Sequence, residues 1–141
     1  MKSYVLDASA LLRFIENQPG ASRVEELLNL ARAGQARVAL SAVNWGEVYY
    51  VMARHRGEAE AKSYSVRFRN LPVEIVAADW SRAESAGLFL ERFKIPYADS
   101  FAGSLAADES ATLVTADYDF TVVANAIGVE FLPLKKKRTA H

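Results

Sequence analysis

Cysteine is absent from this 141-residue sequence, and its absence excludes a disulfide framework, a thiolate zinc site and a cysteine nucleophile. Glycine is scarce as well: the seven glycines are scattered, so the chain has no glycine-rich phosphate loop. No apolar run approaches the roughly 18–20 residues needed to cross a bilayer. The apolar stretch before Asp7 is also too short for a secretory signal. We therefore expect a cytoplasmic protein that makes no membrane contact.

The formal net charge of the sequence is zero, because 17 basic residues balance 17 acidic ones. The two signs are nevertheless segregated, since the charged residues that follow Glu130 are all basic. At this length we expect one domain, residues 1–134, and a basic C-terminal tail, residues 135–141. The body alone is acidic, so bulk charge does not indicate a strongly basic nucleic-acid-binding protein. The tail is typical of a solvated extension, with phosphate contact as the second interpretation.

Short apolar runs alternate with segments of helical periodicity along the whole chain. We expect strands at residues 4–6, 37–40, 73–77, 112–115 and 129–132. We expect helices at residues 8–18, 21–33, 42–57, 58–70, 80–93, 98–108 and 118–127. This alternation predicts an α/β domain with a mainly parallel central sheet. In such sheets, ligands bind beyond the carboxyl ends of the strands.

Acidic residues occur where this fold would place a ligand. Asp7 and Asp117 follow the first and fourth predicted strands, and Asp99 lies in the first turn of a predicted helix. Glu47 has apolar neighbours four residues away on both sides, so we expect it on an inward-facing stripe of its helix. A carboxylate there is costly unless it is paired or binds a cation. If the four acids converge, a cation must offset their repulsion.

The ligand set would consist of oxygen atoms, because no histidine or cysteine accompanies these acids. Oxygen ligands suit Mg²⁺ or Mn²⁺ better than zinc, and such ions chiefly serve phosphoryl chemistry. Ser9 and Thr115 each stand two residues from an aspartate and offer hydroxyls to hold a carboxylate or a metal-bound water. Asp119 is close enough to Asp117 in sequence to be an accessory ligand.

Each carboxylate also has a purely structural interpretation. Asp7, Asp99 and Asp117 are all placed where a helix N-cap is expected. Glu47 lies mid-helix and is no cap, but an ion pair with an arginine would account for it. The spacing alone leaves the two interpretations open. The other aspartates, Asp79 and Asp108, are expected to be capping or surface residues.

Other chemistries fit less well. A serine triad has no credible base, because His55 lies on a polar face and His141 is terminal. A receiver-like signalling domain needs an acidic pair at the first strand, whereas Leu6 precedes Asp7. A phosphatase of the haloacid type needs a second aspartate where Ser9 stands.

Four segments together resemble the PIN domain and, within it, the VapC-type toxins of toxin–antitoxin pairs. They are VLDASA at 5–10, LSAVNWGEV at 40–48, IPYADSFA at 95–102 and LVTADYDF at 113–120. Each segment alone is weak evidence, but four in this order and at this spacing are specific. The resemblance covers nearly the whole chain.

The resemblance implies an α/β/α sandwich and a Mg²⁺- or Mn²⁺-dependent endoribonuclease that cleaves RNA through a metal-activated water. By motif position, the acidic quartet is Asp7, Glu47, Asp99 and Asp117, a frequent fifth acid is Asp119, and the hydroxyl positions are Ser9 and Thr115. The resemblance also implies a homodimer and a cognate antitoxin. The alternative is a PIN-like RNA-processing or RNA-binding module that is no toxin.

Basic residues gather on the predicted helices at 42–57 and 58–70. The candidates for contact with RNA or antitoxin are Arg54, Arg56, Lys62, Arg67 and Arg69, with Arg23, Arg32 and Arg37 as equal alternatives. The aromatic residues of these helices are Tyr49, Tyr50, Tyr64 and Phe68. At helical spacing such residues belong more often to a core or a dimer interface than to a base-stacking surface.

Overall fold

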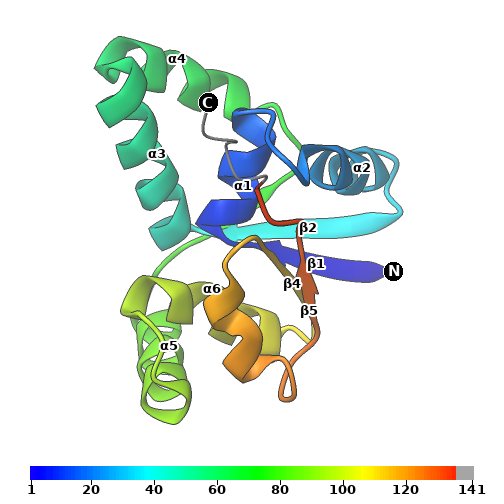
Figure 1. Ribbon diagram of the computed structural model, residues 1–141, viewed down its shortest axis with the longest axis vertical. Helices are drawn as coiled ribbons and strands as arrows, with labels where there is room; N and C mark the ends of the chain where they lie inside the picture. The colour runs from blue at the N-terminus through cyan, green and yellow to red at the C-terminus, as the bar shows by residue number, and fades with distance from the viewer. Residues whose placement is uncertain (136–141) are drawn as a thin grey trace, which may run out of the picture.

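The computed structural model describes residues 1–135, and over this range five parallel strands form one sheet in the order β3-β2-β1-β4-β5 (Figure 1). The strands are β1 (Lys2–Leu6), β2 (Ala36–Ser41), β3 (Glu74–Val76), β4 (Thr112–Thr115) and β5 (Val129–Phe131). The predicted α/β class and parallel sheet are confirmed. The basic residues predicted as a tail lie, from residue 136 on, outside the described residues.

Helices cover both faces of the sheet, which makes the α/β/α sandwich (Figure 1). On one face lie α1 (Ala8–Ile15), α2 (Ala21–Arg32), α3 (Ala42–Arg56) and α4 (Glu58–Phe68). On the other lie α5 (Trp80–Phe93), α6 (Tyr97–Asp108) and the 3₁₀ helix η1 (Tyr118–Val123). In the described part of the chain, no helix has both the length and the apolar character to cross a membrane.

The alternation of side chains along the central strand divides the apolar core in two. Tyr4 and Leu6 pack with the α1–α4 side, whereas Val5 packs with α5 and α6. Successive side chains of a strand point to opposite faces, so a strand covered by helices on both faces is apolar at every position. This explains why residues 4–6 are continuously apolar rather than alternating.

The sheet changes direction between β1 and β4. The chain runs outward from β1 to β2 and β3, then returns across the sheet so that β4 pairs with the other side of β1. Leu6 is in register with Val114, and the Asp7 N–H donates to the Val114 carbonyl at 3.2 Å. The carboxyl ends of these two strands are therefore adjacent, at the switch point where such folds bind ligands.

Two predicted helices are shorter than expected. The first ends at Ile15 because Asn17 adopts a positive φ of 50° and Pro19 follows. The segment 118–127 forms only the short 3₁₀ helix η1, which begins where Asp117 accepts a hydrogen bond from the Asp119 N–H. In the second case apolar residues continue to Ile127, past the point where the 3₁₀ helix ends.

The small residues of α6 allow a close contact with α5. A Cβ atom on Gly103 would lie 2.5 Å from the Phe89 ring, so only glycine fits at this crossing. All of residues 100–106 are buried. This packing holds α6, whose first turn carries Asp99, against the central strands β1, β2 and β4.

Candidate active site

Asp7 occupies the carboxyl end of β1 and is only 3% exposed. Its Oδ1 accepts hydrogen bonds from Ser9 Oγ at 2.7 Å and from the Ala10 N–H at 2.8 Å. Its Oδ2 accepts one from Thr115 Oγ1 at 2.5 Å. The bond to Ala10 makes Asp7 the N-cap of α1, so the capping interpretation is correct for this residue. Capping uses one oxygen and does not exclude a role for the other.

The two predicted hydroxyls link Asp7 to the end of β4. Ser9 Oγ accepts from the Ala116 N–H, and Thr115 Oγ1 accepts from the Asp117 N–H, both at 2.9 Å. Asp117 in turn caps η1 through the Asp119 N–H. Ser9 and Thr115 thus hold the two aspartate-bearing turns in one hydrogen-bonded unit. This arrangement agrees with their prediction as carboxylate-supporting residues.

Asp99 lies in the first turn of α6 but is not its cap, because the N-cap is Pro96 and no side chain bonds there. Burial, and after it the charges of four other acids, together raise the pKa of the Asp99 carboxyl to about 7. In decreasing order of effect, these acids are Asp117, Asp7, Glu47 and Asp119. The structure therefore brings all five predicted acids into one electrostatic cluster, which we call the acid cluster.

The pKa of Asp7 is raised as well, to about 6, chiefly by burial. The hydrogen bonds from Thr115, Ala10 and Ser9 lower it, and the charge of Asp117 raises it. Three donors favour the ionised form of a carboxyl group. Here they do not fully compensate for the loss of water around it.

Glu47 contributes to the acid cluster from α3, but not from an inward-facing stripe as predicted. The buried stripe of α3 consists of Asn44, Val48 and Met52, and Glu47 lies beside it, partly exposed. Asn44 Nδ2 donates to Glu47 Oε1 at 2.8 Å. In the described chain no lysine or arginine forms an ion pair with Glu47, so no arginine of residues 1–135 supplies the alternative of a structural ion pair.

Asn44 is a site residue that the sequence analysis missed. It is 1% exposed and also donates from Nδ2 to the Ala98 carbonyl at 3.1 Å, which ties α3 to the first turn of α6. Within residues 1–135 its Oδ1 is a buried oxygen without a donor. The available signal was a polar residue on the same helical stripe as Val48 and Met52.

Arg13 was missed too. It is 7% exposed, and its Nη1 donates to the carbonyls of Pro19 and Pro133 at 2.6 and 2.8 Å. Arg13 therefore ties the segment that follows β5 to α1. A buried arginine held by carbonyls from two distant segments leaves no local sequence signal.

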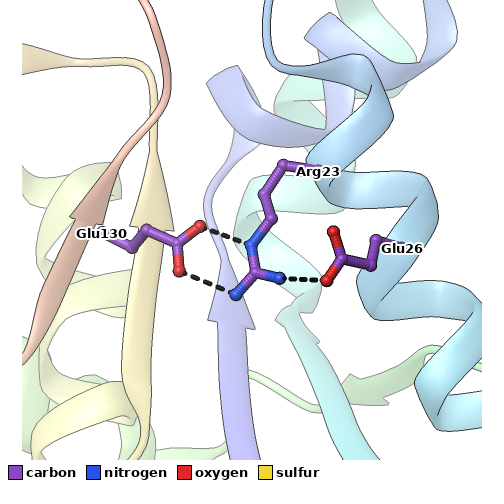
Figure 2. Close-up of polar contacts among 3 residues, drawn as sticks. All are labelled: Arg23, Glu26 and Glu130. Atoms are coloured by element: carbon purple, nitrogen blue, oxygen red, sulfur yellow. Dashed lines mark hydrogen bonds and ion pairs between the residues drawn. The ribbon is translucent and has the colours of Figure 1, made fainter.

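Arginines distant from the acid cluster are paired with glutamates instead. Figure 2 shows the Arg23 guanidinium between Glu130 and Glu26, with Nε and Nη2 on Glu130 at 2.8 and 3.0 Å. Arg37 pairs with Glu74 at 2.6 Å. The candidates on α3 are engaged as well, because Arg56 pairs with Glu60 at 3.7 Å and Arg54 donates to Tyr50 Oη at 3.5 Å. The choice among these arginines for contact with an anionic partner therefore stays a prediction.

The basic residues of α3 and α4 are exposed, as a contact surface requires. The exposed members are Arg54, Arg56, Lys62, Arg67 and Arg69. Among the aromatic residues, Phe68 is buried and stacks on Trp45 with ring centroids 4.3 Å apart. Tyr50 is 53% exposed. Asp79 caps α5, and Asp108 binds Arg82 and Ser85 at the surface, as predicted for both.

The donor chemistry of the acid cluster fits a divalent cation. The five carboxylates offer oxygen ligands, and so does Asn44 Oδ1, which accepts no hydrogen bond within residues 1–135. Oxygen is the ligand type of Mg²⁺ and Mn²⁺. In the described chain no lysine or arginine forms an ion pair with any of the five acids. Among residues 1–135, no three aspartate, glutamate or histidine side chains lie close enough together to hold a metal ion as they stand. Within the described chain, the mutual repulsion of the five acids is therefore not offset by a basic side chain.

Several solved structures are similar to this chain. VapBC2 from Rickettsia felis, bound to a DNA fragment from their promoter, matches at a TM-score of 0.72 and 24% identity, over 93% of this chain and 99% of that chain. DNA-bound VapBC from Salmonella typhimurium matches at a TM-score of 0.73 and 20% identity, over 93% of this chain and 98% of that chain. VapC20 from Mycobacterium tuberculosis, described as a Sarcin-Ricin loop cleaving toxin, matches at a TM-score of 0.69 and 16% identity. The match covers 92% of this chain and 99% of that chain. These likenesses show a shared fold.

At the level of sequence, no curated protein matches the chain. The family model of the PIN domain, in contrast, matches residues 4–126. This range includes the carboxyl end of β1, all of β4 and all five members of the acid cluster. The chain therefore belongs to the PIN domain family.

Proposed function

We propose that the chain is a Mg²⁺- or Mn²⁺-dependent endoribonuclease that acts as the toxin of a toxin–antitoxin pair. The observation that carries the proposal is the acid cluster: four carboxylates surround the half-buried Asp99, and the five acids come from four segments of the chain without a paired cation in the described residues. Such a cluster lowers the stability of the metal-free protein, so a structural role does not explain it.

Asp7, Asp99 and Asp117 would hold the cation, and Glu47 would complete the shell or orient the attacking water. Asp119, which is exposed at the start of η1, would be an accessory ligand. When bound, the cation supplies an activated water and stabilises the negative charge that develops on the phosphate.

The remaining roles belong to side chains that position these acids. Ser9 and Thr115 fix the Asp7 carboxylate through both of its oxygens, which prevents the group from rotating. Asn44 fixes Glu47 and the backbone of α6 at the same time. A rigid set of acids holds water and phosphate in line with little reorganisation during the reaction. Because water is the nucleophile, and not the ribose 2′-oxygen, the products would carry a 5′-phosphate and a 3′-hydroxyl.

RNA is the substrate class that this proposal favours. VapC20, whose fold this chain shares, is described as cleaving the Sarcin-Ricin loop, an RNA target. With no net charge on the whole chain, RNA would bind through local cations such as the exposed arginines of α3 and α4. The described VapBC complexes support a cognate antitoxin as the protein partner.

A homodimer is the second assembly that we propose. On α5, Trp80 is 84% exposed and Leu88 is 74% exposed. They lie eight residues apart and therefore on one side of the helix. Large apolar side chains left in water on one helix favour a protein contact. Light scattering of the purified chain, compared with Trp80→Ser, measures the mass directly.

The nuclease is tested by incubating purified protein with a mixed RNA pool in Mg²⁺, in Mn²⁺ and in EDTA. The Asp99→Asn protein serves as the contamination control, since that variant keeps the shape of the side chain and removes its charge. Discrete cuts that disappear in EDTA and in the variant are expected. Equal cutting by the folded variant would contradict the site, and cutting in EDTA would contradict the metal dependence.

The toxin role needs a separate test, because a PIN-like RNA-processing module would pass the first one. Induced expression in a bacterial host should arrest growth with the natural sequence and not with Asp99→Asn. Co-expression of a small protein encoded directly upstream in the source genome should restore growth. Unimpeded growth with an active nuclease would favour the processing module.

A further inference from the structure

Two cavities lie on either side of Tyr118, and one member of the acid cluster lines each of them. The larger, of about 570 Å³, is lined by Ser9, Asp117 and His55. The smaller, of about 330 Å³, is lined by Asp119 and by Pro96, the residue before α6. Tyr118 lines both. The two cavities therefore continue the acid cluster in two directions, with this tyrosine as their common wall.

The Tyr118 side chain is held in a fixed position but is not buried. Its Oη donates to the Leu132 carbonyl at 2.9 Å, and its ring stacks on Phe131 with centroids 4.8 Å apart and an interplanar angle of 29°. The residue is nevertheless 41% exposed. A ring that is anchored at its tip, supported on one face and open to solvent offers a surface on which a further planar group can stack.

Each cavity also contains a lysine. Lys135 lines the larger one, and its position follows from Arg13, which binds the Pro133 carbonyl two residues before it. Lys94 lines the smaller one; its Nζ pairs with Glu91 at 2.9 Å in an exposed contact, which contributes little stability and exchanges easily. A cation on each side of a carboxylate cluster complements a strand that carries a phosphate at every nucleotide.

We propose that Tyr118 is a base-stacking residue at the centre of a path for single-stranded RNA, with backbone phosphates near Lys94 and Lys135 on either side of the acid cluster. This inference rests on the proposed function and specifies how its substrate lies. An unpaired nucleobase stacks on Tyr118 and continues the Tyr118–Phe131 stack. Duplex RNA presents no free base face, so the path selects single strands and loops. Stacking alone distinguishes the four bases weakly.

The test is the affinity of short fluorescent RNA probes for the full chain carrying Asp99→Asn, in Mg²⁺, with probe integrity checked on a gel. The probes are an oligoadenylate and an abasic ribose–phosphate oligomer of the same length. Adding Tyr118→Leu should weaken oligoadenylate binding roughly five- to tenfold and leave the abasic oligomer unchanged. Tyr118→Phe keeps the ring and should restore binding. Ile75→Ala, which shortens an exposed side chain of β3 that lines neither cavity, is the control for a general effect of losing exposed apolar surface.

The lysines are tested through the salt dependence of binding to the same oligoadenylate. Lys94→Gln and Lys135→Gln should each reduce the slope of log affinity against log salt by about 0.7, the value for one phosphate contact on a single strand. Lys2→Gln, at the amino end of β1, should leave the slope unchanged.

The outcomes separate this inference from the proposed function. If the Asp99→Asn chain binds oligoadenylate and Tyr118→Leu binds it equally well while remaining folded, the stacking role is wrong and the nuclease proposal stands. Equal losses on the abasic probe would likewise contradict stacking, because they would show a general disturbance of the site. If no RNA is bound and the natural sequence does not cleave, both proposals fail together.

Discussion

Acidic residues of two kinds occupy two regions of this molecule. On the α2 side of the sheet, Glu130 and Glu26 share the Arg23 guanidinium, and their charges are neutralised where they lie (Figure 2). At the carboxyl ends of β1 and β4, five acids converge without any such pair in the described chain. The paired glutamates help to hold α2 against β5. The unpaired acids repel one another, and this uncompensated charge is what the proposed cation would offset.

Removing one charge from each region should have different consequences: RNA cleavage should be lost in the acid cluster and kept at the paired glutamates. The largest expected effect is the loss of cleavage. Asp7→Asn should reduce the rate of RNA cleavage more than about 100-fold, because loss of a metal ligand exceeds the effect of losing a supporting residue. The variant should fold, since an asparagine Oδ1 can still accept from Ser9 and the Ala10 N–H. Initial rates at saturating Mg²⁺ measure the loss.

Glu130→Gln is the matched control for this substitution, because it also replaces a carboxylate by an amide. It should cleave RNA at the natural rate. A comparable loss in both variants would mean that activity follows stability and not the acid cluster, and the distinction between the two regions would fail.

Much of the acid cluster could be predicted from the sequence. Asp7 and Asp117 end strands, and parallel strands bring their carboxyl ends to one edge of the sheet. Pro96 marks the start of α6, which places Asp99 in a first turn. These positions follow from local signals combined with one rule of topology. The convergence itself depended on the fold and on the resemblance to the PIN domain.

The missed features depend on helical phase and on distant contacts. Glu47 was assigned to the buried stripe because Val43 and Val51 are apolar, but both are only partly buried, and the stripe runs through Asn44 one turn earlier. A single polar residue on such a stripe resembles a solvent-facing position until its partners are known. Arg13 binds a carbonyl 120 residues away, and the sequence contains no trace of that contact.

The second prediction concerns the pH dependence of stability without metal. The pKa of Asp7 is about 6 in the folded chain against an ordinary value of 3.8, so folding favours the protonated form. Between pH 3.8 and pH 6 the folded chain therefore binds more protons than the unfolded chain, so the free energy of unfolding falls across this window, by about 3 kcal/mol in full, and is level above it. The raised pKa of Asp99 acts in the same direction. In EDTA the chain should be more stable at pH 5 than at pH 8, as measured by urea unfolding.

Asp7→Asn isolates the contribution of this one group. The variant cannot ionise at this position, so the gain in its free energy of unfolding from pH 8 to pH 5 in EDTA should be smaller than that of the natural chain, by about 1–2 kcal/mol. Glu130→Gln should keep the full pH dependence over this interval. A natural chain whose stability rises from pH 5 to pH 8 would contradict the sign of the argument.

A smaller effect is expected when the Arg23–Glu130 pair is broken. Glu130→Gln removes the charge from a two-point contact whose side chains are each 32% exposed. Solvent screening reduces the value of such a pair, so the free energy of unfolding should fall by about 0.5–1 kcal/mol. Urea unfolding at neutral pH in low salt measures this change. High salt should diminish it, whereas an effect that is independent of salt would point to lost packing between α2 and β5.

The smallest effect is expected at Arg37, which is paired with Glu74 between β2 and the edge strand β3. Both side chains are about half exposed, at 48% and 55%, so water and salt screen the pair almost completely. Arg37→Gln should therefore leave the thermal midpoint unchanged within error, although the contact is shorter than those of Arg23. A clear decrease in the midpoint would mean that the pair secures β3 to the sheet. The contrast between the two regions would then be one of paired against unpaired acids, irrespective of exposure.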